Sequence, residues 1–231
     1  MKEIGKKDES EESKETFNLS PSGLSLMEEC QRCFWLEKHH IWKRPQSIFP
    51  SLPGGMDRIL KRHFDRFMVR RMMPPELRDN IHCFGCRLFG NAELLKQWRN
   101  EKSGIMWQDK EGNIFHGAID NLLVRGDKLI VLDYKTRGYA LKEDTAKLYQ
   151  NQLDCYNFLL RKNGYDTEDF SFLLFYYPRE VLETGEVVFD TQLVKIKVNI
   201  ENAERLFNKA IKLLRGPCPK EGCEWCGLIK F

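Results

Sequence analysis

The stretch that decides the fold is GAIDNLLVRGDKLIVLDYKT, residues 117–136. Two apolar runs flank RGDK (residues 125–128), and a central Gly-Asp pair between such runs is typical of a hairpin turn. If the first and last residues of RGDK close the hairpin, facing residues are those whose numbers sum to 253. Asp120 then faces Asp133, with Cβ atoms about 5 Å apart. A register shift of one residue would remove this pairing.

Two acids and a lysine converge on one face of this hairpin. Lys135 lies two residues beyond Asp133 and therefore points to the same side of the strand. That face also carries apolar side chains and is at least partly buried: Leu122, Leu129 and Val131. Facing like charges destabilise a sheet, and a hard divalent cation such as Mg²⁺ would offset the repulsion between the carboxylates. The alternative is a surface hairpin whose charges face water.

The remaining chain alternates helical and strand-like patterns. Apolar residues at helical spacing predict helices at 22–38, 55–72, 92–100, 144–165 and 202–216. Runs of alternating or continuous apolar residues predict strands at 81–89, 103–110, 113–124, 171–180 and 187–198. This order predicts a single α/β domain, in which a mixed β-sheet is flanked by α-helices.

Composition sets broad limits on the protein. The 231 residues are 42% hydrophobic, which suits a globular domain, and carry a net charge of +3. Residues 1–17 hold four Lys and six Asp or Glu, so they contribute −2 and leave +5 for residues 18–231. We expect a disordered polar tail over 1–17 and a folded, mildly basic domain over 18–231, which permits a nucleic-acid partner. Residues 1–17 lack the apolar region of a signal peptide, and no run of apolar residues is long enough to span a membrane. The expected location is therefore cytoplasmic.

Four motifs together resemble a known family. They are SPS (20–22), GAID (117–120), DYK (133–135) and QLDCY (152–156). The combination resembles the PD-(D/E)xK nuclease superfamily, and within it the RecB-like exonuclease branch, over most of the ordered chain. The resemblance implies a restriction-endonuclease-like fold.

The resemblance also implies roles for individual residues. Asp120, Asp133 and the backbone carbonyl of Tyr134 would hold Mg²⁺ or Mn²⁺, and Lys135 would orient or activate the attacking water. Four residues apart on one helix, Gln152 and Tyr156 share a face. The resemblance turns that face towards the active site and the nucleic acid; ordinary helix packing is the alternative.

Asp57 is a departure from the branch pattern. The branch often carries a histidine on an early helix that reaches the metal, and GGMD (54–57) places an acid there. Asp57 could serve as a third metal ligand. It could equally be an acid near a helix N-terminus, where the helix dipole favours negative charge.

Six of the eight cysteines form C-x-x-C pairs, at 30/33, 83/86 and 223/226. In a chain without a secretory signal, such pairs favour metal or redox use over disulfides. The resemblance implies a cysteine-bound 4Fe-4S cluster that staples the first helix to the C-terminal tail, with Zn²⁺ as the alternative. The expected ligands are Cys30, Cys33, Cys223 and Cys226. One alternative set joins Cys30 to Cys218, Cys223 and Cys226, and in another the 83/86 pair replaces either expected pair.

The function implied is a metal-dependent nuclease that hydrolyses DNA phosphodiester bonds. The resemblance points to an exonuclease on single-stranded ends, in DNA repair, recombination or defence. The chain has no helicase motif, so an unwinding partner would be a separate helicase or nuclease-complex subunit; no membrane partner is expected. A non-catalytic, metal-stapled nucleic-acid-binding module of the same fold is the alternative. A redox protein is less consistent with C-x-x-C pairs that do not open a helix after a strand.

Overall fold

The structure, a computed structural model, describes residues 15–45, 51–227 and 229. Most of the expected tail, residues 1–14, lies outside the described residues. The helices are α1 (Pro21–Glu29), α2 (Gln31–Lys38), α3 (Ser51–Val69), α4 (Pro75–Arg78), α5 (Ala92–Trp98), α6 (Gln150–Lys162), α7 (Ile200–Leu214) and α8 (Glu224–Gly227). Two 3₁₀ turns are η1 (Ile81–Cys83) and η2 (Thr145–Tyr149). The strands are β1 (Asn18–Leu19), β2 (Cys86–Leu88), β3 (Ile105–Gln108), β4 (Ile114–Gly117), β5 (Asn121–Arg125), β6 (Lys128–Thr136), β7 (Phe170–Val181) and β8 (Val187–Lys197).

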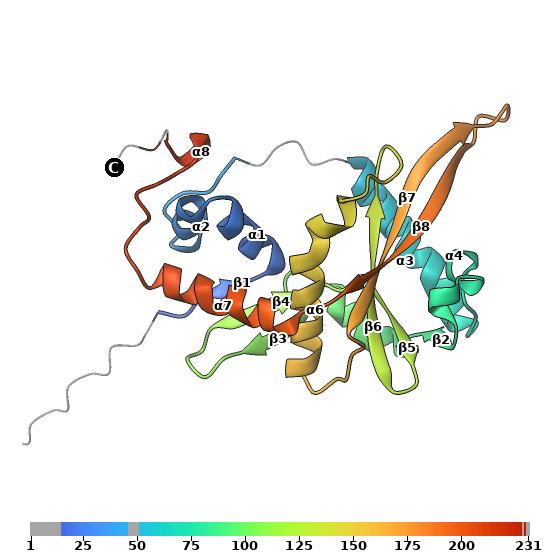
Figure 1. Ribbon diagram of the computed structural model, residues 1–231, viewed down its shortest axis with the longest axis horizontal. Helices are drawn as coiled ribbons and strands as arrows, with labels where there is room; N and C mark the ends of the chain where they lie inside the picture. Colours follow the sequence, from blue (N-terminus) through green and yellow to red (C-terminus); the bar gives the residue numbers. More distant parts are fainter. Residues whose placement is uncertain (1–14, 46–50, 228, 230–231) are drawn as a thin grey trace, which may run out of the picture.

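The strands form two sheets (Figure 1). The larger has the order β2-β5-β6-β7-β8, with β6 and β7 parallel and the other neighbours antiparallel. The smaller has the order β1-β4-β3. Helix α6 contacts β3 and β4 of the smaller sheet and β6 of the larger, so it links the two sheets. The expected α/β domain with a mixed sheet flanked by helices is confirmed.

The predicted hairpin register is confirmed. Arg125 pairs with Lys128 and Asn121 pairs with Leu132, so numbers of facing residues sum to 253 along the ladder. Gly126 adopts a φ of +56°, a left-handed angle that glycine tolerates without a Cβ clash. Asp120 lies one residue before β5 begins, directly beyond the last pair of the ladder.

Both faces of the larger sheet are covered. Leu122 and Val131 point into one buried cluster with α6 and α7, whereas Leu123 and Leu132 point into a second cluster with α3. Figure 1 shows α6 and α3 on opposite sides of the strands. A strand buried on both faces needs apolar residues at successive positions, which accounts for the continuous apolar run of β6.

Two strand predictions were wrong in detail. The run at 113–124 is not one strand but β4 and β5, which belong to different sheets and are joined by residues 118–120. In this crossing, the amide of Ile119 donates to the carbonyl of Trp98 and not to a strand. The run at 81–89 contains only the short β2, because η1 and Gly85, at φ +73°, form a turn before it.

The helix predicted at 22–38 is broken at Cys30. This residue has extended backbone angles, φ −157° and ψ 107°, and separates α1 from α2. Its sulfur accepts a hydrogen bond of 3.4 Å from the amide of Cys33 and so caps α2. Phe17 belongs to the core and not to a tail, being 5% exposed with its amide bonded to Asn113.

Segments far apart in the sequence meet at one end of the molecule. Helix α8 lies beside α2, and α7 lies beside α1 and α2 (Figure 1). At the opposite end, the hairpin of β7 and β8 projects beyond the rest of the larger sheet (Figure 1). None of the helices in the described part of the chain is long and apolar enough to cross a membrane.

Candidate active site and metal centre

Asp133 and Lys135 form the buried centre of the candidate active site. Asp133 is 1% exposed on β6, and its Oδ2 lies 2.5 Å from the Nζ of Lys135. Burial raises the pKa of Asp133 to about 7; Lys135 opposes this shift, and the nearby Asp120 carboxylate adds to it. Although burial alone lowers the pKa of Lys135, the two carboxylates raise it above its ordinary value. Lys135 is therefore a cation held by two acids.

Helix α6 brings the other two predicted residues to Lys135. The lysine Nζ donates to Gln152 Oε1 at 3.1 Å, and Gln152 Nε2 donates to the Tyr156 hydroxyl at 2.7 Å. The Tyr156 ring lies against Gly117, where an added Cβ would approach a ring carbon to 2.8 Å. Asp133, Lys135, Gln152 and Tyr156 thus form one chain of contacts between β6 and α6. Their catalytic roles stay a prediction.

Asp120 is held by three groups. Its Oδ2 accepts from the amide of Tyr134 at 3.1 Å, and its Oδ1 lies 2.9 Å from the Nζ of Lys61. Its backbone carbonyl accepts from Arg99 at 2.7 Å. The Arg99 guanidinium also binds both carboxylate oxygens of Asp65 on α3, each at 2.9 Å. These contacts fix the crossing between the two sheets.

Within the described part of the chain, Asp57 is linked to the site through Lys61. The lysine Nζ lies 2.9 Å from an oxygen of Asp57 and equally far from Asp120. The role of Asp57 as a ligand stays a prediction. Because α3 begins at Ser51 and not near Gly55, Asp57 lies well inside the helix, so the expectation of an acid at a helix N-terminus was wrong.

Tyr134 contributes to the two faces of the sheet differently. Its amide binds Asp120, but its side chain lies on the opposite face, where the hydroxyl accepts from Asn121 at 2.7 Å and the ring packs on Phe64. Only its backbone carbonyl is therefore available for the predicted role at the metal.

Three contacts of the site were not predicted from the sequence: Lys61, Arg99 and Tyr149. The Lys135 Nζ lies 4.6 Å from the centre of the Tyr149 ring, where the ring face favours a cation. Lys61 carries a weak sequence signal, since it lies four residues after Asp57 on one helix. Arg99 and Tyr149 act through tertiary contacts that no sequence pattern shows.

The acids fit a hard divalent cation. Asp133 Oδ2 is buried, and the cation beside it is the ammonium group of Lys135, 2.5 Å away. The nearby carboxylate of Asp120 adds to the cost of ionising the buried Asp133, which a further cation would offset. Carboxylate oxygens are also the ligands that Mg²⁺ and Mn²⁺ prefer.

The second group of candidate ligands is the cysteine cluster: Cys30, Cys33, Cys223 and Cys226. All four sulfurs lie within 4.8 Å of one another. Cys30 and Cys226 are 3.7 Å apart, Cys33 and Cys223 are 3.5 Å apart, and Cys223 and Cys226 are 3.9 Å apart. Because Cys30 caps α2 and Cys223 directly precedes α8, each C-x-x-C pair turns both thiols to the same side.

The surroundings of the cysteine cluster act differently on its thiols. The guanidinium of Arg44 donates to the sulfurs of Cys33 and Cys223, at 3.7 and 3.6 Å, and also pairs with Glu29. The backbone amide of Cys226 lowers the pKa of Cys223 to about 6, although burial opposes the shift. Burial raises the pKa of Cys33 and of Cys226, as expected for thiols enclosed in an apolar cluster.

The other cysteines lie apart from this set of four. Cys218 packs beside the cluster, but its sulfur is not among those within 4.8 Å. Cys83 belongs to the core on the α3 side, where burial raises its pKa to about 12, and Cys86 packs against the same core. Cys155 is fully buried in α6. The structure therefore gathers the two-plus-two set of cysteines.

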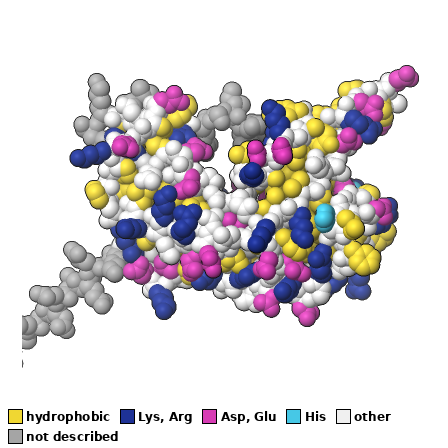
Figure 2. All heavy atoms as spheres, in the orientation of Figure 1, with side chains coloured by type: hydrophobic (Ala, Val, Ile, Leu, Met, Phe, Trp, Pro, Cys, Tyr) yellow, Lys and Arg dark blue, Asp and Glu magenta, His cyan; other side chains and the backbone are white. Residues whose placement is uncertain are grey.

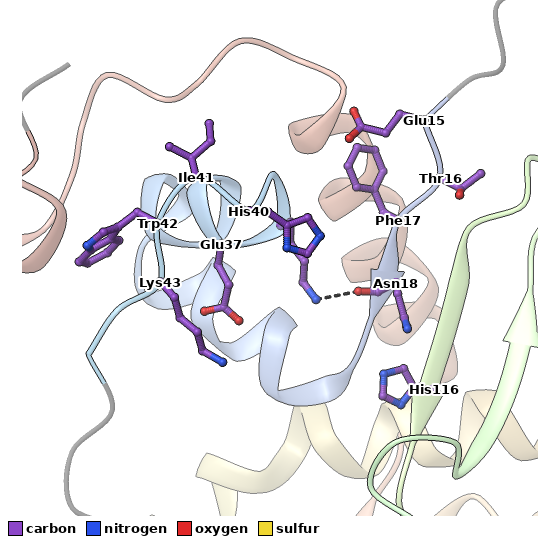
Figure 3. Close-up of a pocket in the computed structure, with 11 residues that line it drawn as sticks. Glu15, Thr16, Phe17, Asn18, Glu37, His40, Ile41, Trp42, Lys43 and His116 are labelled. Carbon is purple, nitrogen blue, oxygen red and sulfur yellow. Dashed lines mark hydrogen bonds between the residues drawn. The ribbon is translucent and has the colours of Figure 1, made fainter.

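A cavity of about 710 Å³ lies elsewhere, between the first described residues, the end of α2 and β4 (Figure 3). His116 lines it on the β4 side, and burial together with Lys38 lowers the pKa of this histidine. Lys38 donates to the backbone oxygen of Asn18, the dashed contact in Figure 3. Neither the two acids of the active site nor Lys135 lines this cavity.

The chain matches the model of one protein family. The family model described as the PD-(D/E)XK nuclease superfamily matches residues 53–230. This match spans most of the chain, from α3 through β6 and α6 to Cys223 and Cys226. The protein belongs to the PD-(D/E)XK nuclease superfamily, and the expected restriction-endonuclease-like fold is confirmed.

No curated protein matches the chain. A solved structure titled "Crystal structure of SSO0001" is similar over 90% of this chain and 81% of that chain, with 13% sequence identity and a TM-score of 0.45. A likeness at that level carries no argument about function.

Proposed function

We propose that the protein is a metal-dependent deoxyribonuclease that hydrolyses phosphodiester bonds as an exonuclease on single-stranded ends. The observation that carries the proposal is the convergence of Asp120, Asp133 and Lys135 on one side of a buried hairpin, with Lys135 held by α6. A pair of acids and a lysine in this arrangement has little structural use, because facing carboxylates repel one another. A role in DNA repair, recombination or defence, with a separate helicase or nuclease-complex subunit, is the setting we propose.

Each residue has a distinct part in the proposed reaction. Asp120, Asp133 and the Tyr134 carbonyl would hold Mg²⁺ or Mn²⁺. When bound, the metal polarises the phosphodiester and lowers the pKa of a water molecule. Lys135, fixed between Asp133 and Gln152, would orient that water and stabilise the negative charge that develops on the phosphate. Tyr156, through its bond to Gln152, would hold the amide in the orientation that accepts from Lys135.

The test is cleavage of labelled single-stranded and double-stranded DNA with Mg²⁺ or Mn²⁺. Lys135→Ala should lower the rate by about a hundredfold or more, since it removes a charge aimed at the reacting phosphate. Lys128→Ala is the matched control, because this exposed lysine begins the same strand. End-labelled products separate exonuclease from endonuclease cutting.

Equal rates for wild type and Lys135→Ala would refute the catalytic proposal. DNA binding without cleavage under either metal would favour the alternative, a non-catalytic nucleic-acid-binding module of the same fold. The intact pair of acids and the buried lysine support the enzyme over that alternative.

We also propose that the cysteine cluster holds one tetrahedral Zn²⁺. Thiolates at about 2.3 Å from a tetrahedral ion lie about 3.8 Å from one another. The sulfur separations of 3.5, 3.7 and 3.9 Å have this spacing. In a 4Fe-4S cluster each thiolate binds a different iron, so the sulfurs lie farther apart. The geometry thus supports zinc, the alternative raised by the sequence, over the iron–sulfur cluster.

Metal analysis and the visible spectrum of protein purified without oxygen decide the matter. One zinc per chain in a colourless protein is the expected result, and replacing Cys30, Cys33, Cys223 and Cys226 with serine should remove it. A broad brown absorption with iron and sulfide would establish the 4Fe-4S cluster instead.

A further inference from the structure

Four arginines follow one ridge of α3. Arg58, Arg62, Arg66 and Arg70 recur at intervals of four residues, and all four are exposed. Arg70 directly follows the helix, and its amide still donates to the carbonyl of Arg66. Residues four apart are neighbours on a helix surface, with a rise of about 6 Å between them. The ridge is therefore a line of positive charge about 18 Å long.

Acidic side chains do not neutralise this ridge. Both acids of α3 are engaged elsewhere, Asp57 with Lys61 and Asp65 with Arg99. Among residues 15–45, 51–227 and 229, no acidic side chain pairs with any of the four arginines. Like charges at this spacing destabilise a helix, so the row has a cost within the protein itself.

Exposed charged side chains on other long helices pair with side chains of opposite charge. On α7, Lys209 pairs with Glu28 of α1, and Glu204 pairs with Lys162 of α6. The face that carries α6 and α7 shows basic and acidic side chains interspersed (Figure 2). A solvated helix face of this kind has mixed signs, whereas the ridge of α3 has a single sign and also exposes Val69.

The helix that carries the ridge borders the candidate active site. Arg58 follows Asp57, and Lys61, one turn further along α3, contacts Asp120 directly. Leu60 and Phe64 pack α3 against the larger sheet, and this packing fixes the position of the helix relative to the site. A polyanion lying along the ridge would therefore be held on the helix whose Lys61 contacts Asp120 of the site.

We propose that the arginine ridge of α3 binds the phosphate backbone of the nucleic acid and directs the strand to the active site. Arginine forms bidentate hydrogen bonds with phosphate, and regularly spaced arginines suit a ligand with regularly spaced charges. The inference rests on the proposed function for the identity of its ligand. Binding by the ridge itself needs no metal.

The experiment measures binding of labelled single-stranded DNA in EDTA, so that no cleavage occurs. Arg58, Arg62, Arg66 and Arg70 are replaced together with glutamine, which keeps helix propensity. We expect affinity to fall at least about tenfold at low salt, and the slope of log K against log salt to fall by about 0.7 for each phosphate that the variant no longer neutralises. The salt range is about 50 to 200 mM.

A charge-matched control separates the ridge from net charge alone. Arg87, Lys96, Lys110 and Lys128 are exposed and lie on other elements, and their joint replacement with glutamine removes the same charge. This control should change affinity much less than the ridge variant. Thermal unfolding of both variants shows that each is folded.

Strand length gives a second readout. If the strand runs from the site along the ridge, Arg70 contributes only when the DNA spans about 18 Å beyond Arg58. Shortening the oligonucleotide should therefore abolish the effect of Arg70→Gln before that of Arg58→Gln. Disappearance of both effects at the same length would contradict a directed strand.

The outcomes distinguish this inference from the proposed nuclease activity. If the protein binds DNA through the ridge but never cleaves it, the proposed nuclease activity is refuted and the proposed binding by the ridge is supported. A protein that cleaves DNA while the ridge variant binds and cleaves like wild type would refute the ridge alone. Binding of the ridge to vesicles rich in phosphatidylserine, but not to DNA, would overturn the assignment to nucleic acid.

Discussion

Gly117 is needed because of its neighbour. A Cβ at this position would lie 2.8 Å from the Tyr156 ring, whereas a Cβ at Gly138 would meet nothing within 4 Å. Gly117→Ala should destabilise the protein by about 1–3 kcal/mol through overpacking, and Gly138→Ala should not. Urea unfolding measures both. In a Tyr156→Ala background the cost of Gly117→Ala should fall to the smaller cost of the contact with Leu159 Cδ1 at 3.2 Å, and an unchanged cost there would contradict the contact with Tyr156.

The buried carboxyl of Asp133 predicts how metal affinity depends on pH. Burial raises its pKa to about 7, so near neutral pH a fraction of the metal-free protein carries a proton on this acid. A metal binds the carboxylate, so that proton must leave, and affinity for Mn²⁺ should rise as the pH increases from about 6 to about 8. Calorimetry in buffers of different ionisation enthalpy measures the released proton. Affinity independent of pH over this range would contradict it.

The strand register made the central residues of the site predictable from the sequence. The 253 register placed Asp120 opposite Asp133 and Lys135 beside it, because side chains alternate strictly along a strand. Lys61 and Arg99 were not predicted, since their contacts with Asp120 depend on how α3 and α5 approach the hairpin. No local pattern encodes that approach.

The break between α1 and α2 places Cys30 as the N-cap of α2, which the sequence pattern did not predict. Apolar residues continue at helical spacing through Cys30, so the pattern predicted one helix, yet Cys30 is extended and caps α2. Cys30→Ser should keep the cap, because serine is a good N-cap, while removing a ligand. Cys30→Ala should lose both.

The two variants at Cys30 give a graded outcome. Zinc content should fall in both, and in the presence of a chelator Cys30→Ala should be less stable than Cys30→Ser by about 1 kcal/mol. Urea unfolding in the chelator measures the difference. Equal stability there would show that the sulfur does not act as a cap.

Elements with strong periodicity were predicted best. Helix α7 and strands β7 and β8 follow the predicted ranges within a few residues, because amphipathic and apolar patterns directly reflect burial. The division of 113–124 into β4 and β5 was not predictable, because the apolar pattern hardly changes where the chain leaves one sheet for the other.

At the scale of the molecule, the cysteine cluster joins distant parts of the chain. Cys33 and Cys223 are 190 positions apart, and α8 is short. Removing the metal with a chelator should therefore detach α8 and lower the stability by roughly 2–4 kcal/mol, which lowers Tm by about 5–15 °C. Differential scanning calorimetry measures the change. Cys218→Ser is the matched control and should behave as wild type, with the same response to the chelator.

The distance between the two cysteine pairs has a consequence for biosynthesis. During translation, Cys30 and Cys33 are made first, and Cys226 follows 196 positions after Cys30. Until then the first pair has no partners, and its thiols are open to oxidation or to capture of a metal in an incomplete site. Loading of the proposed metal into the complete site would therefore be a late event that follows the exit of α8 from the ribosome, and a nascent chain stalled before Cys223 would carry every predicted catalytic residue but not this centre.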